Sequence, residues 1–265
     1  IQIHIEKSSD TEAAVQLNGH GTEFHDILAR LKSLPKRRFD AKLKSWFVPI
    51  DQESVHKLLS TFPRADIGPK LNSFLDSRRE KTALELELEK IKLSGDVDIT
   101  DYNFSKTEPM PHQRASFEVL RRLQNGANWS QMGTGKTLVS AHVAKYRMDQ
   151  GLIKNVLIVC PISVFSVWAD PLDGQLITSG IAEPKDILLL DGPTNRCLDL
   201  MLNWPHVWCI TNYEKLWRII RSLEDNNLSA HYDMIIADES TKIKNHSTKV
   251  FKGMMKIGKP AKHRI

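Results

Sequence analysis

The chain has 265 residues, of which 41% are hydrophobic and 26% charged, and a formal net charge of +5. This length leaves room for one domain of about 150 residues and a smaller one. No apolar run approaches the roughly 20 residues of a membrane span, and no signal peptide is visible. The three cysteines lack Cys-x-x-Cys spacing, which argues against a disulfide framework or a zinc site. We therefore expect an intracellular protein with no membrane partner.

The first segment, residues 1–70, predicts a small α+β domain. Residues 1–5 alternate as a strand, 23–34 and 54–62 have helical spacing, and 38–50 reads as a turn followed by a strand. Positive charge and aromatic surface interleave here, a composition suited to DNA backbone contact and base stacking, at Arg37, Arg38, Lys44 and Trp46. The alternative is that Trp46 and Phe47 are core residues.

Residues 71–104 are predicted to be a helical linker. Residues 83–93 alternate with period two, but they are strong helix formers, and Leu84, Leu88 and Ile91 also recur at helical spacing. We therefore expect a helix here that ends at Ser94 and Gly95.

A glycine-rich loop in the third segment, residues 105–265, predicts a nucleoside-triphosphate site. Its candidate binding residues are Met132, Gly133, Thr134, Gly135, Lys136 and Thr137. The glycines let backbone N–H groups converge on phosphates, while Lys136 would reach the β- and γ-phosphates and the Thr137 hydroxyl would hold Mg²⁺. A strand at 127–130 and a following helix would complete the motif, although Ser130 stands where glycine is usual. The alternative is a flexible turn that happens to precede a lysine.

Short apolar runs and helical stretches alternate through the rest of this segment. The runs at 156–160, 187–190 and 207–210 have the length of buried strands, and helices are expected near 163–169, 194–202 and 213–223. This alternation predicts an α/β fold with a doubly wound, mostly parallel sheet that binds ligands at the carboxyl ends of its strands.

Two adjacent carboxylates, Asp238 and Glu239, follow an apolar run at 231–237. Such a run is typical of a parallel strand that is buried on both faces and ends at the ligand. Asp238 would complete the Mg²⁺ shell and Glu239 would orient water for attack on the γ-phosphate, which makes Lys136, Asp238 and Glu239 the candidate catalytic residues. The alternative is an acidic helix cap after a core strand.

Residues 108–265 resemble the first RecA-like lobe of Swi/Snf-type superfamily 2 helicases. The motifs that carry the resemblance are Pro111-His112-Gln113, Met132-Gly-Thr-Gly-Lys-Thr137, Val159-Cys-Pro-Ile-Ser163 followed by Trp168, Ile210-Thr-Asn-Tyr-Glu214, and Asp238-Glu-Ser-Thr241 with Lys244-Asn245. The resemblance implies an ATP- and Mg²⁺-dependent DNA translocase or helicase.

The resemblance also implies roles for single residues. Gln113 would read adenine, because an amide can donate to and accept from its N6/N7 edge. Ser163 and Thr211 would contact the DNA backbone, although Ser163 could instead cap a helix. Two departures are visible: Ser130-Gln131 replaces an acidic pair, and Thr241 stands in place of a histidine that usually couples hydrolysis to DNA.

Positive charge concentrates near the end of the sequence. Residues 242–264 hold eight basic and no acidic side chains, beginning with Lys242 and Lys244. Such a cluster would favour DNA phosphates in a salt-dependent manner. The alternative is a solvated, lysine-rich helix and loop.

A second resemblance lies in the first segment, where Phe39-Asp40 and Trp46-Phe47-x-Pro49-Ile50 are similar to the HepA-related-protein (HARP) domain that precedes the motor in annealing helicases. The sequence stops where the resembling proteins continue into a second RecA-like lobe, whose arginine finger contributes about 10³ to 10⁵ in rate. We therefore expect the N-terminal part of a motor on duplex or branched DNA in repair, recombination or fork remodelling, with ATP binding but little hydrolysis here. The alternatives are a P-loop kinase or small-molecule NTPase, and a non-catalytic DNA-binding module.

Overall fold

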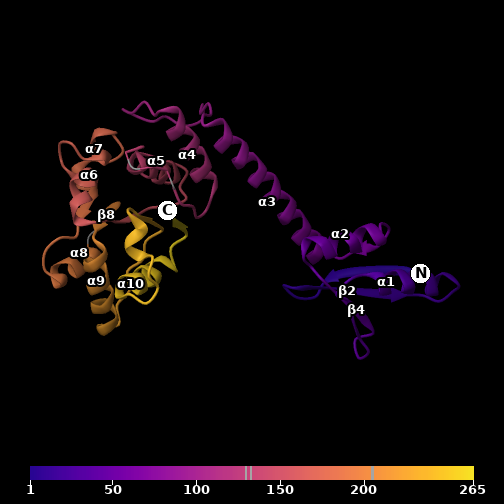
Figure 1. Ribbon diagram of the computed structural model, residues 1–265. Helices are drawn as coiled ribbons and strands as arrows, with labels where there is room; N and C mark the ends of the chain where they lie inside the picture. Colours follow the sequence, from indigo (N-terminus) through magenta and orange to yellow (C-terminus); the bar gives the residue numbers. More distant parts are fainter. Residues whose placement is uncertain (129, 132, 204–205) are drawn as a thin grey trace. The chain divides into compact units, whose positions relative to one another are not determined.

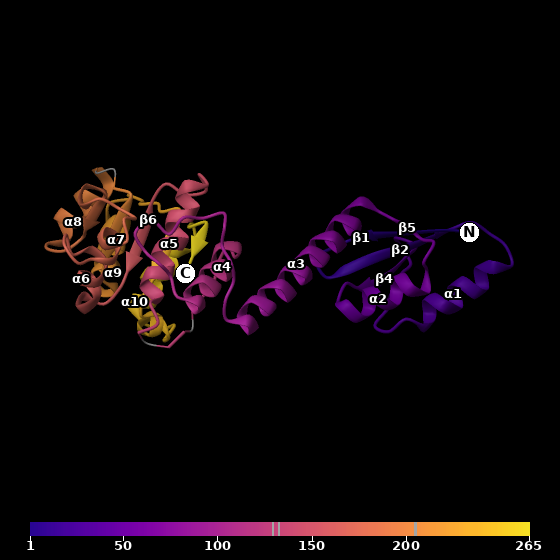
Figure 2. The ribbon, with the colours of Figure 1, turned by 90° about the horizontal axis from the view of Figure 1, so that it is seen from above.

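The computed structural model describes residues 1–128, 130–131, 133–203 and 206–265. The chain forms two compact units, Ile1–Glu87 and Leu88–Ile265 (Figure 1). Each unit has its own five-stranded sheet. The division between the units falls inside one long helix, α3 (Pro69–Ser94) (Figure 2).

The first unit is an α+β fold whose strands lie in the order β3-β4-β2-β1-β5. The strands are β1 (Gln2–Lys7), β2 (Glu12–Asn18), β3 (Arg38–Asp40), β4 (Ser45–Pro49) and β5 (Asp66–Ile67), and the helices are α1 (Glu23–Ser33) and α2 (Gln52–Thr61). Only β5 pairs in parallel, with β1. Ile5, Val15, Leu31 and Leu58 are fully buried between the sheet and the helices. The predicted strand at the start and both predicted helices are confirmed.

Helix α3 settles how residues 83–93 fold. In a strand, Leu86 and Leu88 would share one face, but Leu86 is 56% exposed while Leu88 and Ile91 are buried. Leu71, the third residue of the helix, belongs to the core of the first unit. The predicted helix is therefore confirmed and begins earlier than expected.

The second unit contains the predicted doubly wound sheet, in the order β10-β9-β6-β8-β7, with every pair parallel. Its strands are β6 (Val156–Val159), β7 (Ile187–Leu189), β8 (Trp208–Thr211), β9 (Met234–Ala237) and β10 (His263–Arg264). Its helices are α4 (Pro111–Arg122), α5 (Lys136–Asp149), η1 (Ile162–Val164), α6 (Phe165–Ala169), α7 (Gln175–Thr178), η2 (Pro184–Asp186), α8 (Thr194–Asn203), α9 (Tyr213–Asp225), η3 (Ser240–Ile243) and α10 (Lys249–Gly258).

Successive residues of the central strand β6 enter two separate cores. Val156 and Ile158 pack with residues of α4, α5 and α6, whereas Leu157 and Val159 pack with residues of α8, α9 and α10. Because side chains alternate across a strand, the sheet is covered by helices on both faces. This burial explains why the strand sequences are continuously apolar rather than alternating.

The strand predicted at 127–130 is not found at Ala127, Asn128 or Ser130, and residue 129 lies outside the described residues. The segment joins the sheet only by a bridge between Asn125 and Arg264 and a hydrogen bond from the Gly126 N–H to the Arg264 carbonyl. Its partner β10 comprises two residues, so the ladder does not continue. The sheet thus places β10 between β9 and the segment that leads into the glycine-rich loop.

The three cysteines are free and buried. Burial raises the pKa of the Cys160 thiol to about 12. Within the described ranges, none of the helices combines the length and apolar character that crossing a bilayer requires.

Candidate nucleotide site

The turn at Gly135 is built against the side chain of Gln113. Gly133 and Gly135 have φ of +79° and +78°, a region that glycine adopts without strain. A Cβ at Gly135 would lie 2.3 Å from Nε2 of Gln113, whereas one at Gly133 would meet nothing within 4 Å. Gln113 Nε2 donates to the Thr134 carbonyl at 3.1 Å, and its Oε1 accepts the Met110 N–H at 3.0 Å. The backbone conformation therefore favours glycine at 135, and a side chain there would push the Gln113 amide aside.

Lys136 begins α5 with its ammonium group turned back over the loop. Nζ donates to the carbonyls of Ser130 at 3.1 Å and Gln131 at 2.9 Å. The first N–H groups of α5 and the positive end of its dipole face the same region, which favours an anion. Thr137 follows in the first turn and is partly buried, while Met132 lies outside the described residues.

Asp238 and Glu239 follow β9 at the carboxyl edge of the sheet. Oδ2 of Asp238 accepts the indole N–H of Trp168 at 2.8 Å, and Oδ1 accepts the Glu239 N–H at 3.0 Å. The Tyr213 hydroxyl donates to the Asp238 carbonyl at 2.6 Å. The first two contacts orient the carboxylate, and the third holds the backbone of Asp238 in place.

Glu239 is exposed and has φ of +52°, which costs a non-glycine residue on the order of 1–3 kcal/mol and recurs at functional sites. It precedes η3, but its side chain makes no capping hydrogen bond there. The structure therefore does not support the helix-cap alternative for Glu239.

One cavity of about 400 Å³ brings the loop lysine and both carboxylates together. It is lined by Lys136 and Ser140 of α5, by Asp238 and Glu239, and by Thr241. Within the described part of the chain, no group of three or more His, Cys, Asp or Glu could hold a metal ion. Mg²⁺ commonly keeps several waters and binds through one or two carboxylates plus substrate phosphates, so the donor set around Asp238 fits Mg²⁺ with a nucleotide. Thr137 does not line this cavity.

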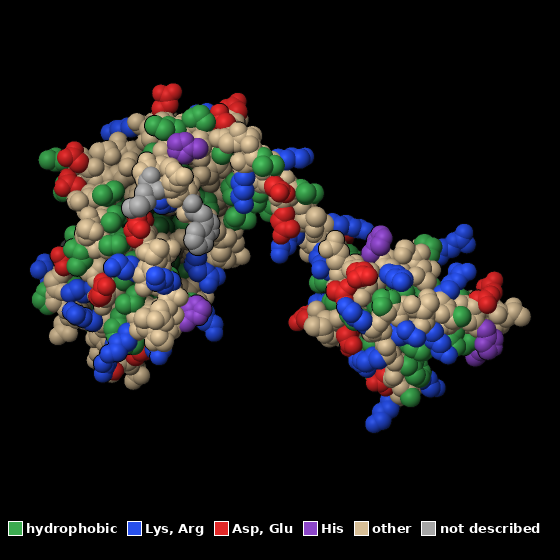
Figure 3. Space-filling model, viewed as in Figure 1, with side chains coloured by type: hydrophobic (Ala, Val, Ile, Leu, Met, Phe, Trp, Pro, Cys, Tyr) green, Lys and Arg blue, Asp and Glu red, His purple; other side chains and the backbone are tan. Residues whose placement is uncertain are grey.

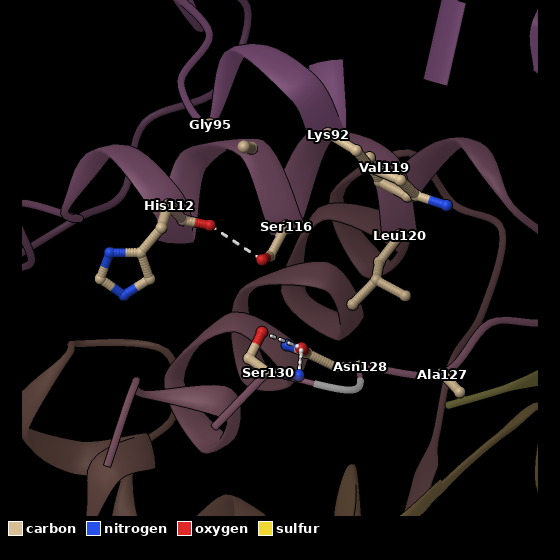
Figure 4. A pocket seen from close by; sticks show the side chains of 10 residues that line it. Lys92, Gly95, His112, Ser116, Val119, Leu120, Ala127, Asn128 and Ser130 are labelled. Carbon is tan, nitrogen blue, oxygen red and sulfur yellow. Dashed lines mark hydrogen bonds between the residues drawn. The ribbon is translucent and has the colours of Figure 1, made fainter. Parts of the chain in front are cut away.

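A second hollow of about 400 Å³ continues from Asn128 and Ser130 to α4 (Figure 4). Val119 and Leu120 supply apolar wall, and the Ser116 hydroxyl points to the His112 carbonyl, to which it donates at 2.8 Å. Gln113 does not line this hollow: its Nε2 is engaged at the loop and its Oε1 at the start of α4. The predicted contact with adenine is therefore not tested by the geometry.

Two buried side chains that no sequence motif marked hold α5 in place. His142 is 1% exposed and shares a hydrogen bond with the Tyr102 hydroxyl at 3.0 Å, and burial lowers its pKa to about 4. Arg147 is also 1% exposed and donates to the carbonyls of Leu120 and Leu123 at the end of α4. Burial lowers the pKa of Arg147 to about 10. The two helices that flank the loop are thus joined by buried polar contacts.

The two residues expected to touch the DNA backbone have different surroundings. Ser163 is exposed on η1, and Val164, which caps α6, makes no side-chain capping bond, so the structure does not support a capping role for Ser163. Thr211 is completely buried, and its hydroxyl has no partner among the described residues. Direct contact between Thr211 and DNA is not available in this conformation, because neighbouring atoms cover the side chain.

Lys242 and Lys244 are exposed at η3, directly after the two carboxylates. Lysine and arginine side chains also gather over the part of this unit that holds α9 and α10 (Figure 3). Among them, Lys256 pairs with Glu224. For Lys242 and Lys244, no ion pair is recorded in the described ranges.

Some candidate DNA-binding side chains of the first unit make hydrogen bonds within the unit, and others are exposed without such contacts among the described residues. Arg38 makes two hydrogen bonds to Glu12, at 3.0 and 2.7 Å, and lies over the Phe47 ring. Arg37 is exposed and donates to the Leu34 carbonyl at 2.8 Å. The charge of Arg38 is therefore largely balanced within the unit.

An open hollow of about 590 Å³ lies between α1 and the β3–β4 hairpin. Phe39, which is 52% exposed, and the half-buried Trp46 line it with ring centroids 5.0 Å apart, and Lys32 and Lys44 complete its polar rim. Phe47 is buried, as the core alternative requires, but Trp46 is not. The sequence had not marked Phe39 or Lys32 as site residues.

The parallel sheet, the glycine loop opening α5 and the paired carboxylates after β9 define a P-loop nucleotide-binding domain of the RecA-like class. Residues 112–265 match the SNF2-related domain, which is more than half of the chain. The chain therefore belongs to the SNF2-related domain family.

Two relatives illustrate the extent of the similarity. The uncharacterized ATP-dependent helicase YqhH of Bacillus subtilis is 26% identical over 151 residues, which cover 53% of this chain and 23% of that protein. The bovine SWI/SNF-related matrix-associated actin-dependent regulator of chromatin subfamily A-like protein 1 is 24% identical over 249 residues, which cover 91% of this chain and 24% of that protein. The second alignment thus extends into the first unit. The chain spans about a quarter of the length of these relatives.

A solved structure, the Sulfolobus solfataricus SWI2/SNF2 ATPase core in complex with dsDNA, has a similar fold. The TM-score is 0.51 at 22% identity, covering 64% of this chain and 33% of that one. The predicted RecA-like fold is therefore confirmed.

Proposed function

We propose that this chain binds ATP and Mg²⁺ in the cavity between α5 and the end of β9, as part of an ATP-dependent DNA translocase or helicase. The observation that carries the proposal is that Lys136, Asp238 and Glu239 line one cavity. Membership of the SNF2-related domain family and the similarity to an ATP-dependent helicase of B. subtilis support it.

Each side chain has a distinct task in this proposal. Lys136 exchanges its two loop carbonyls for phosphate oxygens, and the loop N–H groups bind the remaining oxygens. Asp238 would hold the metal at the cavity, and Thr137, which does not line the cavity here, would join it only if its hydroxyl turned toward the bound nucleotide. The metal would neutralise charge on the phosphates. Glu239, exposed at the cavity, positions the attacking water. In a longer chain that hydrolyses ATP, Glu239→Gln should abolish ATP turnover and leave ATP affinity unchanged.

Gln113 is proposed to serve both the loop and the base. Its amide already holds the Thr134 carbonyl, and its neighbour His112 lines the hollow against α4. Adenine bound beside the loop would meet the amide edge-on, which would favour ATP over other nucleotides. Weaker discrimination between ATP and GTP by Gln113→Ala would support this role.

DNA is proposed to bind through its backbone. Ser163 on η1 and the lysines that begin the basic stretch, Lys242 and Lys244, are exposed and are suited to phosphate rather than base contact. The similar Sulfolobus ATPase core is itself a complex with duplex DNA, which supports this partner. Thr211 would contribute only if the atoms that cover it moved.

The first unit is proposed to be a HARP-like DNA-binding domain. The bovine relative aligns through most of this unit, and the hollow with Phe39, Trp46, Lys32 and Lys44 combines aromatic faces with positive charge. The face of an aromatic ring stacks on a base that has left the duplex. Branched DNA in repair, recombination or fork remodelling, inside the cell, is therefore the proposed setting.

The proposal differs testably from its competitors. We would titrate duplex, forked and single-stranded DNA against the chain at two salt concentrations, with and without ATP and Mg²⁺. A translocase component binds both ATP and DNA, and its DNA affinity falls as salt rises. A kinase or small-molecule NTPase would bind ATP and no DNA, and a non-catalytic module would bind DNA with no dependence on ATP; either result would contradict the proposal.

A further inference from the structure

A buried indole joins the metal-binding edge of the sheet to an exposed turn on a different element. Trp168 is fully buried in α6, and its indole N–H donates to Oδ2 of Asp238 at 2.8 Å. The same helix continues directly from η1, where Ile162 is 65% exposed and Ser163 is also exposed. One continuous helical segment thus reaches from the surface to the carboxylate.

We propose that Trp168 is a positioning residue, which holds the Asp238 carboxylate for Mg²⁺ and transmits DNA contact at η1 to the metal site. This inference rests on the proposed function. It also offers a route for coupling DNA to hydrolysis in a chain where Thr241 replaces the usual histidine.

The geometry favours a positioning role for three reasons. A buried indole N–H needs one acceptor, and here that acceptor is the side chain proposed to hold the metal. The other carboxylate oxygen accepts the Glu239 N–H, so the indole contact is one of the two that set the rotation of the group and the one that comes from a distant element. Phe165 and Trp168 both pack into the core under the sheet, so α6 cannot move at η1 without moving the indole.

The test separates the N–H group from the ring. Trp168→Phe keeps an aromatic side chain but removes the donor, and Trp208→Phe, in β8, is the control because Trp208 is buried in the same core. ATP affinity is measured by calorimetry in EDTA and in Mg²⁺, together with the melting temperature. A hydrogen bond to a charged group contributes a free energy that corresponds to about a tenfold or larger change in affinity.

In EDTA, we expect Trp168→Phe to bind ATP with the affinity of the unsubstituted chain. In Mg²⁺, the increase in ATP affinity should be about tenfold smaller for Trp168→Phe than for the unsubstituted chain. Trp208→Phe should show the same increase in ATP affinity with Mg²⁺ as the unsubstituted chain, at a melting temperature comparable to that of Trp168→Phe. Equal losses in both variants, or no loss in Trp168→Phe, would overturn the positioning role. If the unsubstituted chain binds no ATP, the proposed function itself fails and this inference fails with it.

A second measurement needs no variant at position 168. The ¹⁵N-labelled indole resonances of the chain are recorded with ATP, with ATP and Mg²⁺, and with duplex DNA alone. The Trp168 resonance should shift when Mg²⁺ is added, because the metal withdraws electron density from the acceptor oxygen, and should shift again with DNA, while that of Trp208 stays in place. A Trp168 resonance that responds to neither addition would contradict the inference.

Discussion

At the scale of single residues, the loop depends on a contact that its motif does not contain. Gly133 and Gly135 could both be predicted from the glycine pattern, and both have positive φ. The amide of Gln113 lies against Gly135 alone, a relation between distant positions of the sequence that only the fold creates. The roles of Trp168 and Tyr213 at Asp238 likewise depend on contacts between distant elements.

The two glycines provide a matched pair for testing this contact. Gly133→Ala should cost about 1–2 kcal/mol through backbone strain alone. Gly135→Ala should cost more and also weaken ATP binding, because its Cβ would displace the buried Gln113 amide. Urea denaturation and ATP titration of both variants measure the difference. Equal effects of the two substitutions would show that the amide does not buttress the loop.

At the scale of elements, burial determined what could be predicted. Strands β6, β8 and β9 are apolar on both faces and were recognisable from sequence, as was α9, whose apolar residues recur at helical spacing. Strand β2 could not be predicted from its pattern, because Ala13 and Ala14 near its start are weak strand formers. The strand predicted at 127–130 is not found at its described residues, because the neighbouring strand β10 comprises two residues and pairs with this segment only at Asn125.

Helix α5 carries a buried histidine whose pH response can be measured. The pKa of His142 in the fold, about 4, lies below its ordinary value of 6.5. As pH falls through this interval, the unfolded chain takes up the proton first. The contribution of His142 to the free energy of unfolding is therefore fully present above pH 6.5 and is lost toward pH 4. The loss should be on the order of 3 kcal/mol.

His142→Gln should remove that part of the pH dependence when urea denaturation at neutral pH is compared with denaturation near the folded pKa of about 4. His231→Gln, at an exposed position, is the control and should behave as the unsubstituted chain. An unchanged pH dependence in His142→Gln would contradict the assignment to this ring.

At the scale of the whole molecule, the two units have no core in common, which implies that each has its own free energy of unfolding. Leu58 lies in the core of the first unit and Leu157 in one of the two cores of the second, and both are fully buried. Their truncation to alanine should cost about 2–5 kcal/mol each, confined to the unit that holds the residue. Hydrogen exchange resolved by segment measures this confinement.

Leu58→Ala and Leu157→Ala should also differ in their effect on ATP affinity. Leu58→Ala should leave it unchanged, because every proposed ATP ligand lies in the second unit. Weakened ATP binding by a folded Leu58→Ala variant would contradict independent units.

Binding of ATP through Lys136 in the cavity between α5 and β9 is tested most directly by one calorimetric titration with ATP and Mg²⁺. Lys136→Ala should lower the affinity by about ten- to a hundredfold, the worth of a hydrogen bond to a charged group. Lys145→Ala, on the same helix but paired with Asp149 outside the cavity, should bind as the unsubstituted chain does. Equal affinities in all three proteins, or no binding in any of them, would contradict the account.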